Sequence, residues 1–303
     1  MHAALQPFHP IIAEWFEARL GIPTPPQVQG WPVIGSGKSA LILAPTGSGK
    51  TLAAFLGAID WLARRLLEAE RQAAALWGIQ ILYVSPLKSL ANDVQKNLLR
   101  PLAELAEVAA SRGEAWPEIR VALRTGDTPQ RERAAIAKRP PHILITTPES
   151  MNLMLTSGTR AALATARYVI VDEVHALAGN KRGVFTALLL ERLEEERKLL
   201  AVPNGRLKSA PGVFVPVENP GALIRIGHSA TARPHPSKTA RSATSPDSAS
   251  TSQPSASSSA TFAAMVAAST SMNAAPAPTR AKALAIAAPM PLAAPVTSTA
   301  RPS

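Results

Sequence analysis

The chain has 303 residues, 46% of them hydrophobic, and a formal net charge of +11, so it is long enough for one large domain or two modest ones. It contains no cysteine, which excludes disulfides and thiolate metal sites and agrees with a cytoplasmic location. The apolar runs are too short to span a bilayer, and no secretion signal is recognised. The basic charge suits a polyanionic partner, although a solvated basic surface accounts for it equally well.

In chain order, residues 1–31 predict a helical entry followed by the proline-rich turn Pro23-Thr24-Pro25-Pro26. Across residues 32–234, short apolar runs alternate with longer amphipathic segments. Strands that alternate with helices predict an α/β fold, with a parallel sheet, helices on both of its faces and ligands at the carboxyl ends of the strands. The predicted strands are 40–44, 79–84, 119–123, 142–146, 168–171 and 223–226, and the predicted helices are 50–68, 89–108, 128–137 and 183–200.

The composition changes abruptly after Ala232. Ser, Ala, Pro and Thr dominate residues 235–303, and no hydrophobic period remains there. Such a segment cannot bury enough apolar surface to offset the entropy lost on ordering, so we expect a disordered low-complexity tail. The Pro- and Gly-rich stretch 203–220 is interpreted as a surface loop before the last predicted strand.

Two similar strings follow one another, Gly35-Ser36-Gly37-Lys38-Ser39 and Gly47-Ser48-Gly49-Lys50-Thr51. A phosphate-binding loop needs a strand, then a Gly-rich turn whose N–H groups surround the phosphates, then a helix. The second string meets this requirement, and the first is interpreted as the turn before a strand. We expect Lys50 to contact the β- and γ-phosphates of ATP and Thr51 to bind Mg²⁺. The remaining loop contacts are expected from Thr46, Gly47, Ser48 and Gly49. A Gly-rich turn without a ligand is the alternative.

A second chemical motif follows the apolar run 168–171, where Asp172, Glu173 and His175 lie at the end of a predicted strand. Two adjacent carboxylates at that place suit nucleotide hydrolysis. Asp172 would hold Mg²⁺, directly or through water, and Glu173 would orient and deprotonate the attacking water. Taken alone, such a pair more often serves as charge at the start of a helix, and a metal site at His175 is a weaker alternative because no partner has ligand spacing.

Together, Asp-Glu-Val-His and Ala-Pro-Thr-Gly-Ser-Gly-Lys-Thr resemble the motifs of superfamily 2 helicases of the DEAD/DEAH type. Further strings make the chain most similar to the large helicase-related (Lhr) family of ATP-dependent DNA helicases, over about residues 7–234. They include Pro23-Thr24-Pro25-Pro26-Gln27, Ser85-Pro86-Leu87-Lys88, Thr146-Thr147-Pro148-Glu149 and Ser229-Ala230-Thr231. The resemblance implies a RecA-like P-loop NTPase domain that uses ATP and Mg²⁺ and binds nucleic acid, with single-stranded DNA favoured and RNA left open.

The resemblance also implies roles for single residues. Gln27 matches a glutamine that reads the adenine edge, Phe8 is a looser candidate for stacking on the base, and His175 belongs to the catalytic motif. Three segments match strand-contacting loops: Ser85-Pro86-Leu87-Lys88, Arg124-Thr125-Gly126-Asp127 and Thr147-Pro148-Glu149. Ser229 and Thr231 match the motif that couples hydrolysis to domain movement. For any one loop, ordinary helix capping by Ser and Thr is the alternative.

The chain also departs from the family pattern. His228 stands where an apolar residue is expected, and nothing after Pro234 resembles the second RecA-like domain, which would be the natural partner. We therefore expect a fragment that binds ATP but unwinds little, with a tail from a shifted reading frame; a genuine basic tail is the alternative. A nucleotide-dependent regulatory module is the other functional reading. A transporter ATPase is disfavoured because its Ser-Gly-Gly-Gln signature is absent. The oligomeric state stays open.

Overall fold

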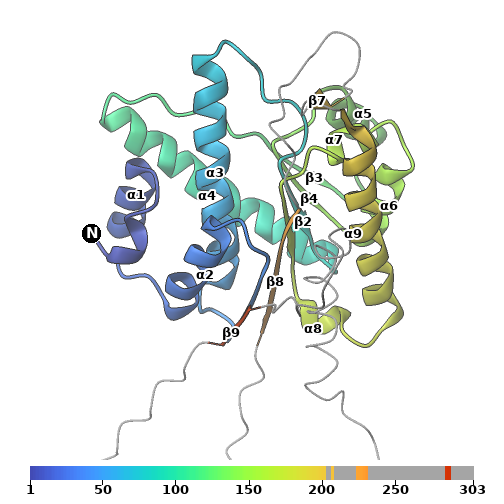
Figure 1. Ribbon diagram of the computed structural model, residues 1–303, viewed down its shortest axis with the longest axis horizontal. Helices are drawn as coiled ribbons and strands as arrows, with labels where there is room; N and C mark the ends of the chain where they lie inside the picture. Colours follow the sequence, from blue (N-terminus) through green and yellow to red (C-terminus); the bar gives the residue numbers. More distant parts are fainter. Residues whose placement is uncertain (203–205, 208–222, 231–283, 288–303) are drawn as a thin grey trace, which may run out of the picture.

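A parallel β-sheet forms the centre of the fold (Figure 1). The computed structural model describes residues 1–202, 206–207, 223–230 and 284–287. The sheet has seven strands in the order β3-β4-β2-β5-β8-β1-β9, and every neighbouring pair is parallel. The strands are β1 (Ala40–Ala44), β2 (Ile81–Val84), β3 (Val121–Arg124), β4 (Ile143–Thr146), β5 (Tyr168–Val171), β8 (Ile224–Ala230) and β9 (Leu284–Ala287).

Helices cover both faces of this sheet, which confirms the expected α/β arrangement (Figure 1). On one face lie α1 (Pro10–Leu20), α2 (Pro25–Gly35), α3 (Lys50–Arg71) and α4 (Lys88–Ser111), after the short 3-10 helix η1 (Ala3–Leu5). The other side carries α5 (Gln130–Lys138), α6 (Pro148–Leu155), α7 (Arg160–Leu163) and α9 (Lys181–Leu200), and α8 (Val174–Leu177) follows β5. No helix within the described ranges is both long and apolar enough to cross a membrane.

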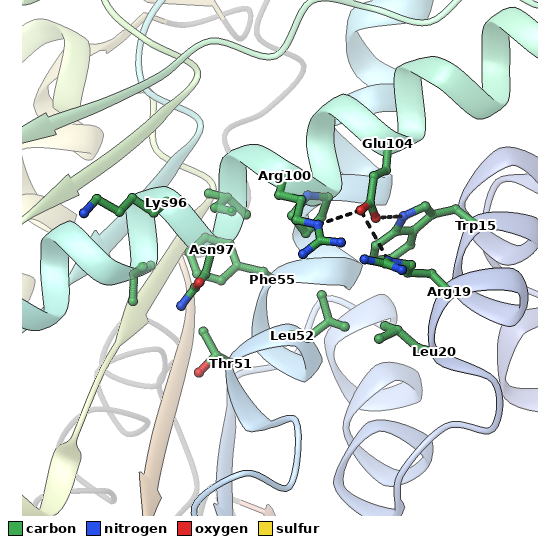
Figure 2. Close-up of a pocket in the computed structure, with 13 residues that line it drawn as sticks. Trp15, Arg19, Leu20, Thr51, Leu52, Phe55, Lys96, Asn97, Arg100 and Glu104 are labelled. Carbon is green, nitrogen blue, oxygen red and sulfur yellow. Dashed lines mark hydrogen bonds and ion pairs between the residues drawn. The ribbon is translucent and has the colours of Figure 1, made fainter.

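The N-terminal helix α1 is held on α4 by one carboxylate (Figure 2). Glu104 accepts a hydrogen bond from the indole Nε1–H of Trp15 at 2.9 Å and one from Arg100 Nε at 2.8 Å. Arg19 adds an ion pair to the same side chain at 3.3 Å. A cavity of about 470 Å³ lies beside this network, between α1, α3 and α4.

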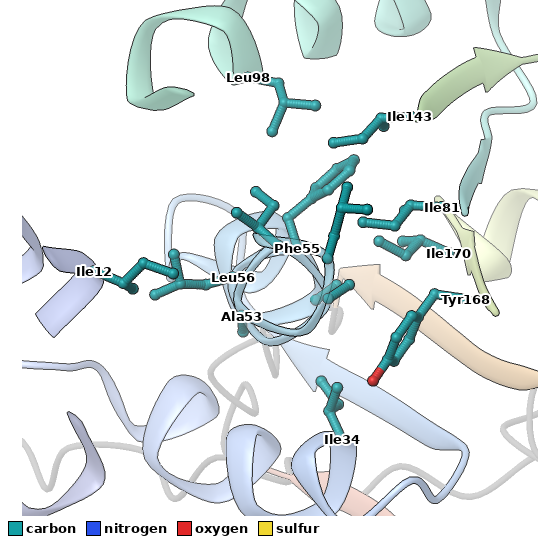
Figure 3. Close-up of a cluster of buried hydrophobic side chains, with 14 of the residues drawn as sticks. Ile12, Ile34, Ala53, Phe55, Leu56, Ile81, Leu98, Ile143, Tyr168 and Ile170 are labelled. Atoms are coloured by element: carbon teal, nitrogen blue, oxygen red, sulfur yellow. The ribbon is translucent and has the colours of Figure 1, made fainter. Parts of the chain in front are cut away.

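Two hydrophobic cores result from the alternation of side chains along each strand. In β5, Tyr168 and Ile170 face the first core, under α1 to α4, whereas Val169 and Val171 face the second core, under α6 to α9. Figure 3 shows the first core around Phe55 of α3, with strand residues on one side and Leu98 of α4 on another. Strand β5 is therefore buried on both faces, and the acidic residues Asp172 and Glu173 follow it at its carboxyl end.

Helix α2 was not expected, because its prolines suggested a turn. Pro25 and Pro26 occupy the first helical turn, where a missing N–H costs nothing, and Gln27 Oε1 accepts the Thr24 N–H at 2.8 Å as in a capping box. The helix continues through Pro32 and so crosses the proposed boundary between residues 31 and 32. It packs on α3 and β1, within the first core.

Little of the segment after residue 200 is described. Residues 201–202 (β6) and 206–207 (β7) form a small antiparallel pair at the start of the predicted loop 203–220. Within the predicted tail 235–303, only β9 is described, where no strand was expected. Its sequence Leu-Ala-Ile-Ala is one of the few wholly apolar stretches of the tail, and it pairs with the free edge of β1. The other residues of the loop and the tail lie outside the described part.

Candidate functional site

The predicted nucleotide-binding residues lie together at the carboxyl edge of the sheet. Lys50 follows β1 and Asp172 follows β5, and β8 lies between these two strands. Neighbouring strands are about 4.8 Å apart, so the two sequence motifs lie roughly 10 Å apart across β8. This is the place where an α/β sheet binds its ligands.

The loop between β1 and α3 has the backbone of a phosphate-binding turn. Gly47 and Gly49 have φ angles of +80° and +79°, a conformation that favours glycine. Thr46, Gly47 and Thr51 are exposed, and the 22-residue helix α3 begins directly after the turn. The first string, at residues 35–39, instead joins α2 to β1, as expected. Only the second string therefore combines a strand, a turn and a helix N-terminus, whose N–H groups favour an anion.

Lys50 places its charge at the centre of this loop. The side chain is 8% exposed, and its Nζ donates to the carbonyl oxygen of Pro45 at 2.8 Å. Burial lowers the pKa of the ammonium group, and the nearby carboxylates of Glu173 and Asp172 oppose that shift. The cation therefore lies between the loop and the acidic motif, where it can face a phosphate and stay close to two acids.

The two residues expected at the adenine differ in their placement. Gln27 lies at the loop, where its Nε2 donates to Gly49 O at 3.5 Å. Phe8 is 9% exposed and packs edge-on against Trp31 in the first core, with a centroid distance of 4.9 Å. Its neighbour His9 donates its N–H to Asp60, ten residues beyond Lys50 in α3, or about 15 Å along the helix. The structure does not bring Phe8 to the loop, and base recognition by either residue stays a prediction.

Asp172 is held from three sides. The side chain is 4% exposed, and its Oδ2 accepts a hydrogen bond from the hydroxyl of Tyr83 on β2. Its Oδ1 accepts the Glu173 N–H at 2.7 Å and lies 3.2 Å from Nδ1 of His228 on β8. Burial, together with the Asp172 charge, raises the pKa of Tyr83, so the phenol stays protonated and donates.

The ring of His228 is buried beside Asp172. Complete burial lowers the pKa of His228, against the opposing effect of Asp172. The ring donates through Nδ1–H to the carboxylate, and Nε2 is buried without a hydrogen-bond partner among the described residues. Sequence reasoning noted His228 only as a departure from the family pattern. Its contact with Asp172 depends on which strands are neighbours, and the sequence does not give that order.

The carboxylate of Asp172 fits one contact to a magnesium ion. Two carboxylate oxygens offer about four acceptor positions, and Tyr83, Glu173 and His228 occupy three of them. One position remains, and Thr51, the other residue expected to bind the ion, is exposed in the first turn of α3. Mg²⁺ commonly takes one or two protein oxygens and completes its shell with phosphates and water, so this oxygen donor set suits it.

Glu173 and His175 connect the acidic motif to β8. Glu173 adopts a left-handed backbone conformation, with φ +46°, and its Oε2 lies 3.0 Å from His175 Nδ1. His175 Nδ1 is 2.9 Å from the hydroxyl of Ser229, which also accepts the His175 N–H at 3.3 Å. The acidic motif and the predicted coupling motif are thus in direct contact through Ser229. Thr231, the other predicted coupling residue, lies outside the described residues.

The predicted strand-contacting loops occupy the other half of the same edge, after β2, β3 and β4. After β2, Ser85 and Pro86 are buried, and Ser85 Oγ donates to Leu87 O at 3.1 Å. Leu87 and Lys88 are exposed, and Lys88 Nζ makes an ion pair of 2.8 Å with Asp127 from the loop after β3. These two loops therefore present one cation and one acid to solvent.

Arg124 does not present its charge at this edge. It is 9% exposed, its Nη1 donates to Thr159 Oγ1 at 3.3 Å, and burial lowers its pKa. The placement of Arg124 therefore does not support the expectation that this residue contacts nucleic acid. Thr125 is also buried, and its N–H donates to Thr128 Oγ1 at 2.8 Å, whereas Gly126 lies beside Lys88.

The loop after β4 begins α6. Thr147 is the N-cap of this helix and accepts the Ser150 N–H at 3.5 Å, while Pro148 occupies the first turn. Glu149 makes a bidentate pair with Arg182, at 2.7 and 2.9 Å. The contacts of Thr147 are thus those of helix capping, which is the alternative function for these loops. Nucleic-acid binding by the three loops stays a prediction.

Comparisons with known proteins agree with this architecture. The family model of the DEAD/DEAH box helicase matches residues 24–210, which is more than half of the chain. The chain belongs to the DEAD/DEAH box helicase family. The matched range contains the phosphate loop, the acidic motif and all three strand-contacting loops. The expected RecA-like fold is therefore confirmed.

Among members of this family, the chain is similar to Lhr proteins. It is 49% identical over 211 residues to "Lhr helicase/ probable uracil glycosylase" of Mycolicibacterium smegmatis, covering 70% of this chain and 13% of the relative. It is 46% identical over 224 residues to "ATP-dependent helicase Lhr-Core protein 2" of Thermococcus barophilus, covering 74% and 23%. The chain thus spans less than a quarter of these relatives.

Solved structures give the same answer. Mycobacterium smegmatis helicase Lhr bound to ssDNA and AMP-PNP matches with a TM-score of 0.62 and 45% identity, over 77% of this chain and 26% of that one. The DEAD-box helicase Mss116 bound to ssRNA and UDP-BeF matches with a TM-score of 0.56 but 17% identity, covering 75% of this chain and 39% of that one, which shows the fold alone.

The two loop glycines offer a matched test of this helicase loop. An alanine Cβ at Gly49 would lie 2.6 Å from Gln27 Nε2, whereas at Gly47 it would meet nothing within 4 Å. Both positions carry the strain of a positive φ, about 1–2 kcal/mol. Gly49→Ala should therefore lower the free energy of unfolding more than Gly47→Ala, because Gln27 must also move. Urea denaturation measures the free energy of unfolding of both variants. An equal decrease in the two variants would contradict the close packing of Gln27 on the loop.

Proposed function

We propose that this chain is the nucleotide-binding lobe of an Lhr-type, ATP-dependent DNA helicase that acts in the cytoplasm. The observation that carries the proposal is the convergence of Lys50, Asp172 and Glu173 at the carboxyl ends of β1 and β5, on either side of β8, with the two acids acting on the lysine charge. The DEAD/DEAH family match and the similarity to a helicase solved with ssDNA and AMP-PNP support it.

At the nucleotide, each residue has a role that follows from its chemistry. The N–H groups of residues 46–49 would surround the phosphates, and Lys50 would neutralise the β- and γ-phosphates. Thr51 and Asp172 would hold Mg²⁺, which supplies charge neutralisation to the phosphates when it is bound. Glu173 would orient the attacking water and accept its proton, and its Oε2 lies 3.0 Å from Nδ1 of His175.

At the other half of the edge, the loops after β2, β3 and β4 would contact single-stranded DNA. Support comes from the exposed Leu87 and Lys88 of the loop after β2, and from the similarity to the Lhr structure solved with ssDNA. Such contacts are to phosphates, so they bind without reading sequence. RNA is the other substrate that this chemistry allows.

A second RecA-like domain would be the partner of this lobe. Phosphoryl transfer in related NTPases depends on an arginine supplied from outside the P-loop domain, which contributes about 10³–10⁵ in rate. The described residues form one such domain, and Asp172, Glu173 and Lys50 lie along an edge that a second domain can cover. Strand separation also needs two lobes that open and close. This lobe alone would therefore bind ATP but separate strands poorly.

Replacement of the two lysines tests the choice of loop. Lys50→Ala should abolish Mg²⁺–ATP binding because it removes the only cation placed at the phosphates by the second string. Lys38→Ala is the matched control and should bind normally, since Lys38 precedes β1 at the opposite end of that strand. Fluorescence titration with a labelled ATP analogue measures both, and equal loss of affinity in the two variants would show that the assignment is wrong.

Addition of a second lobe tests the proposed partner. ATP turnover by the 303-residue chain should be slow and little stimulated by single-stranded DNA. A second RecA-like domain from an Lhr relative, added as a separate protein, should raise turnover if the two lobes dock. Phosphate release and strand separation are the measurements. Robust strand separation by the chain alone would contradict the proposal. DNA-independent binding of a regulatory protein would favour the alternative function, a nucleotide-dependent regulatory module.

A further inference from the structure

A buried histidine lies beside the proposed magnesium aspartate without belonging to either sequence motif. His228 is 2% exposed, and its Nδ1 lies 3.2 Å from Asp172 Oδ1. The family pattern leads one to expect an apolar residue at this position. A polar ring therefore replaces an apolar side chain at the point where β8 passes between the phosphate loop and the acidic motif.

Strand register explains how three distant residues meet. Val171 is level with Gly227, so Asp172 is level with His228, and Ile170 is level with Tyr83. Because side chains alternate along a strand, Tyr83, Asp172 and His228 share one face of the sheet. Phe55 stacks on Tyr83 at 5.1 Å between ring centroids and 17° between ring planes. Both partners of Asp172 are thus fixed by the first core.

The two partners grip the carboxylate from opposite strands. Tyr83 donates its hydroxyl to Oδ2, and His228 donates Nδ1–H to Oδ1. These contacts prevent rotation of the carboxylate and leave one acceptor position free. The other ring nitrogen, Nε2, is buried and has no hydrogen-bond partner among the described residues. Burial of a nitrogen without a hydrogen-bond partner lowers the stability of the fold, and an apolar side chain at this position would not have that effect. The hydrogen bond to Asp172 offsets this loss of stability.

We propose that His228 and Tyr83 are positioning residues that orient the Asp172 carboxylate for Mg²⁺ bound with the nucleotide. The inference rests on the proposed function, because it takes Asp172 as the magnesium aspartate. Hydrogen-bond partners of a metal-binding carboxylate commonly change metal affinity by 10- to 100-fold when they are removed. The donated hydrogen bond, and not the size of the ring, carries the effect.

Four substitutions in the full chain separate these contributions. His228→Leu removes the donor, His228→Asn keeps a donor near the Nδ1 position, and His228→Gln places its amide nearer the Nε2 position. Tyr83→Phe removes one hydroxyl and keeps the stacked ring.

The readout is the Mg²⁺ concentration at half-saturation for binding of a fluorescent, non-hydrolysable ATP analogue. We expect a rise of about tenfold or more for His228→Leu. His228→Gln and Tyr83→Phe should also raise the half-saturating Mg²⁺ concentration. His228→Asn should leave this concentration near that of the unchanged chain.

A second buried histidine gives the control. His142 is also 2% exposed but lies at the start of β4, at the opposite end of the strands, so His142→Leu should leave the Mg²⁺ dependence unchanged. If His228→Leu fails to fold, Tyr83→Phe still decides, because it removes a single hydroxyl. An unchanged half-saturation in His228→Leu or Tyr83→Phe would overturn the inference, as would equal shifts in the Asn and Leu variants. Absence of Mg²⁺-dependent binding in the unchanged chain would overturn the proposed function as well.

Discussion

Burial of the central strands on both faces is the constraint on which the site depends. A strand such as β5 has apolar neighbours above and below it, so a charged side chain within it would lose its hydration without gaining a partner. Within β8 the buried Arg225 and His228 each lie beside an acid, and the charged residues after β5 lie beyond its carboxyl end. In a parallel sheet the carboxyl ends all lie along one edge, and Lys50, Asp172 and the loops proposed to contact nucleic acid lie there. Function at this edge is thus a consequence of how the core is built.

Strand order then divides the edge into two halves. The loops after β5, β8 and β1 form the nucleotide half, and those after β3, β4 and β2 form the half proposed for a nucleic-acid strand. Tyr83 lies on β2, the strand next to β5, yet it holds the aspartate of the nucleotide half. Within the nucleotide half, Ser229 joins β8 to His175. The two halves therefore share the hydrogen bond between Tyr83 and Asp172, and a change at one half can shift the position of groups in the other.

Much of this arrangement could be predicted from the sequence, because apolar runs and turns are local signals. The bounds of β1 and β5 match the prediction, and the choice between the two Gly-rich strings follows from what comes after each. Helix α2 was missed because prolines in a first helical turn resemble those of a loop. Strand β8 continues to Ala230, beyond the predicted end at 226, because pairing with β1 adds backbone hydrogen bonds that side-chain pattern does not reveal. The burial of Arg124 and the contact of His228 with Asp172 depend on tertiary neighbours and could not be predicted.

Hydrogen–deuterium exchange with the two ligands added separately tests the central claim most directly. AMP-PNP with Mg²⁺ should slow exchange in residues 45–51 and 172–175, and single-stranded DNA should slow it in the loops at 85–88, 125–128 and 147–150. Both sets lie on one edge of one sheet but on different strands. Protection of the same residues by both ligands, or protection on the outer faces of α1 and α9 with the edge unchanged, would contradict the assignment of the edge to two adjoining sites.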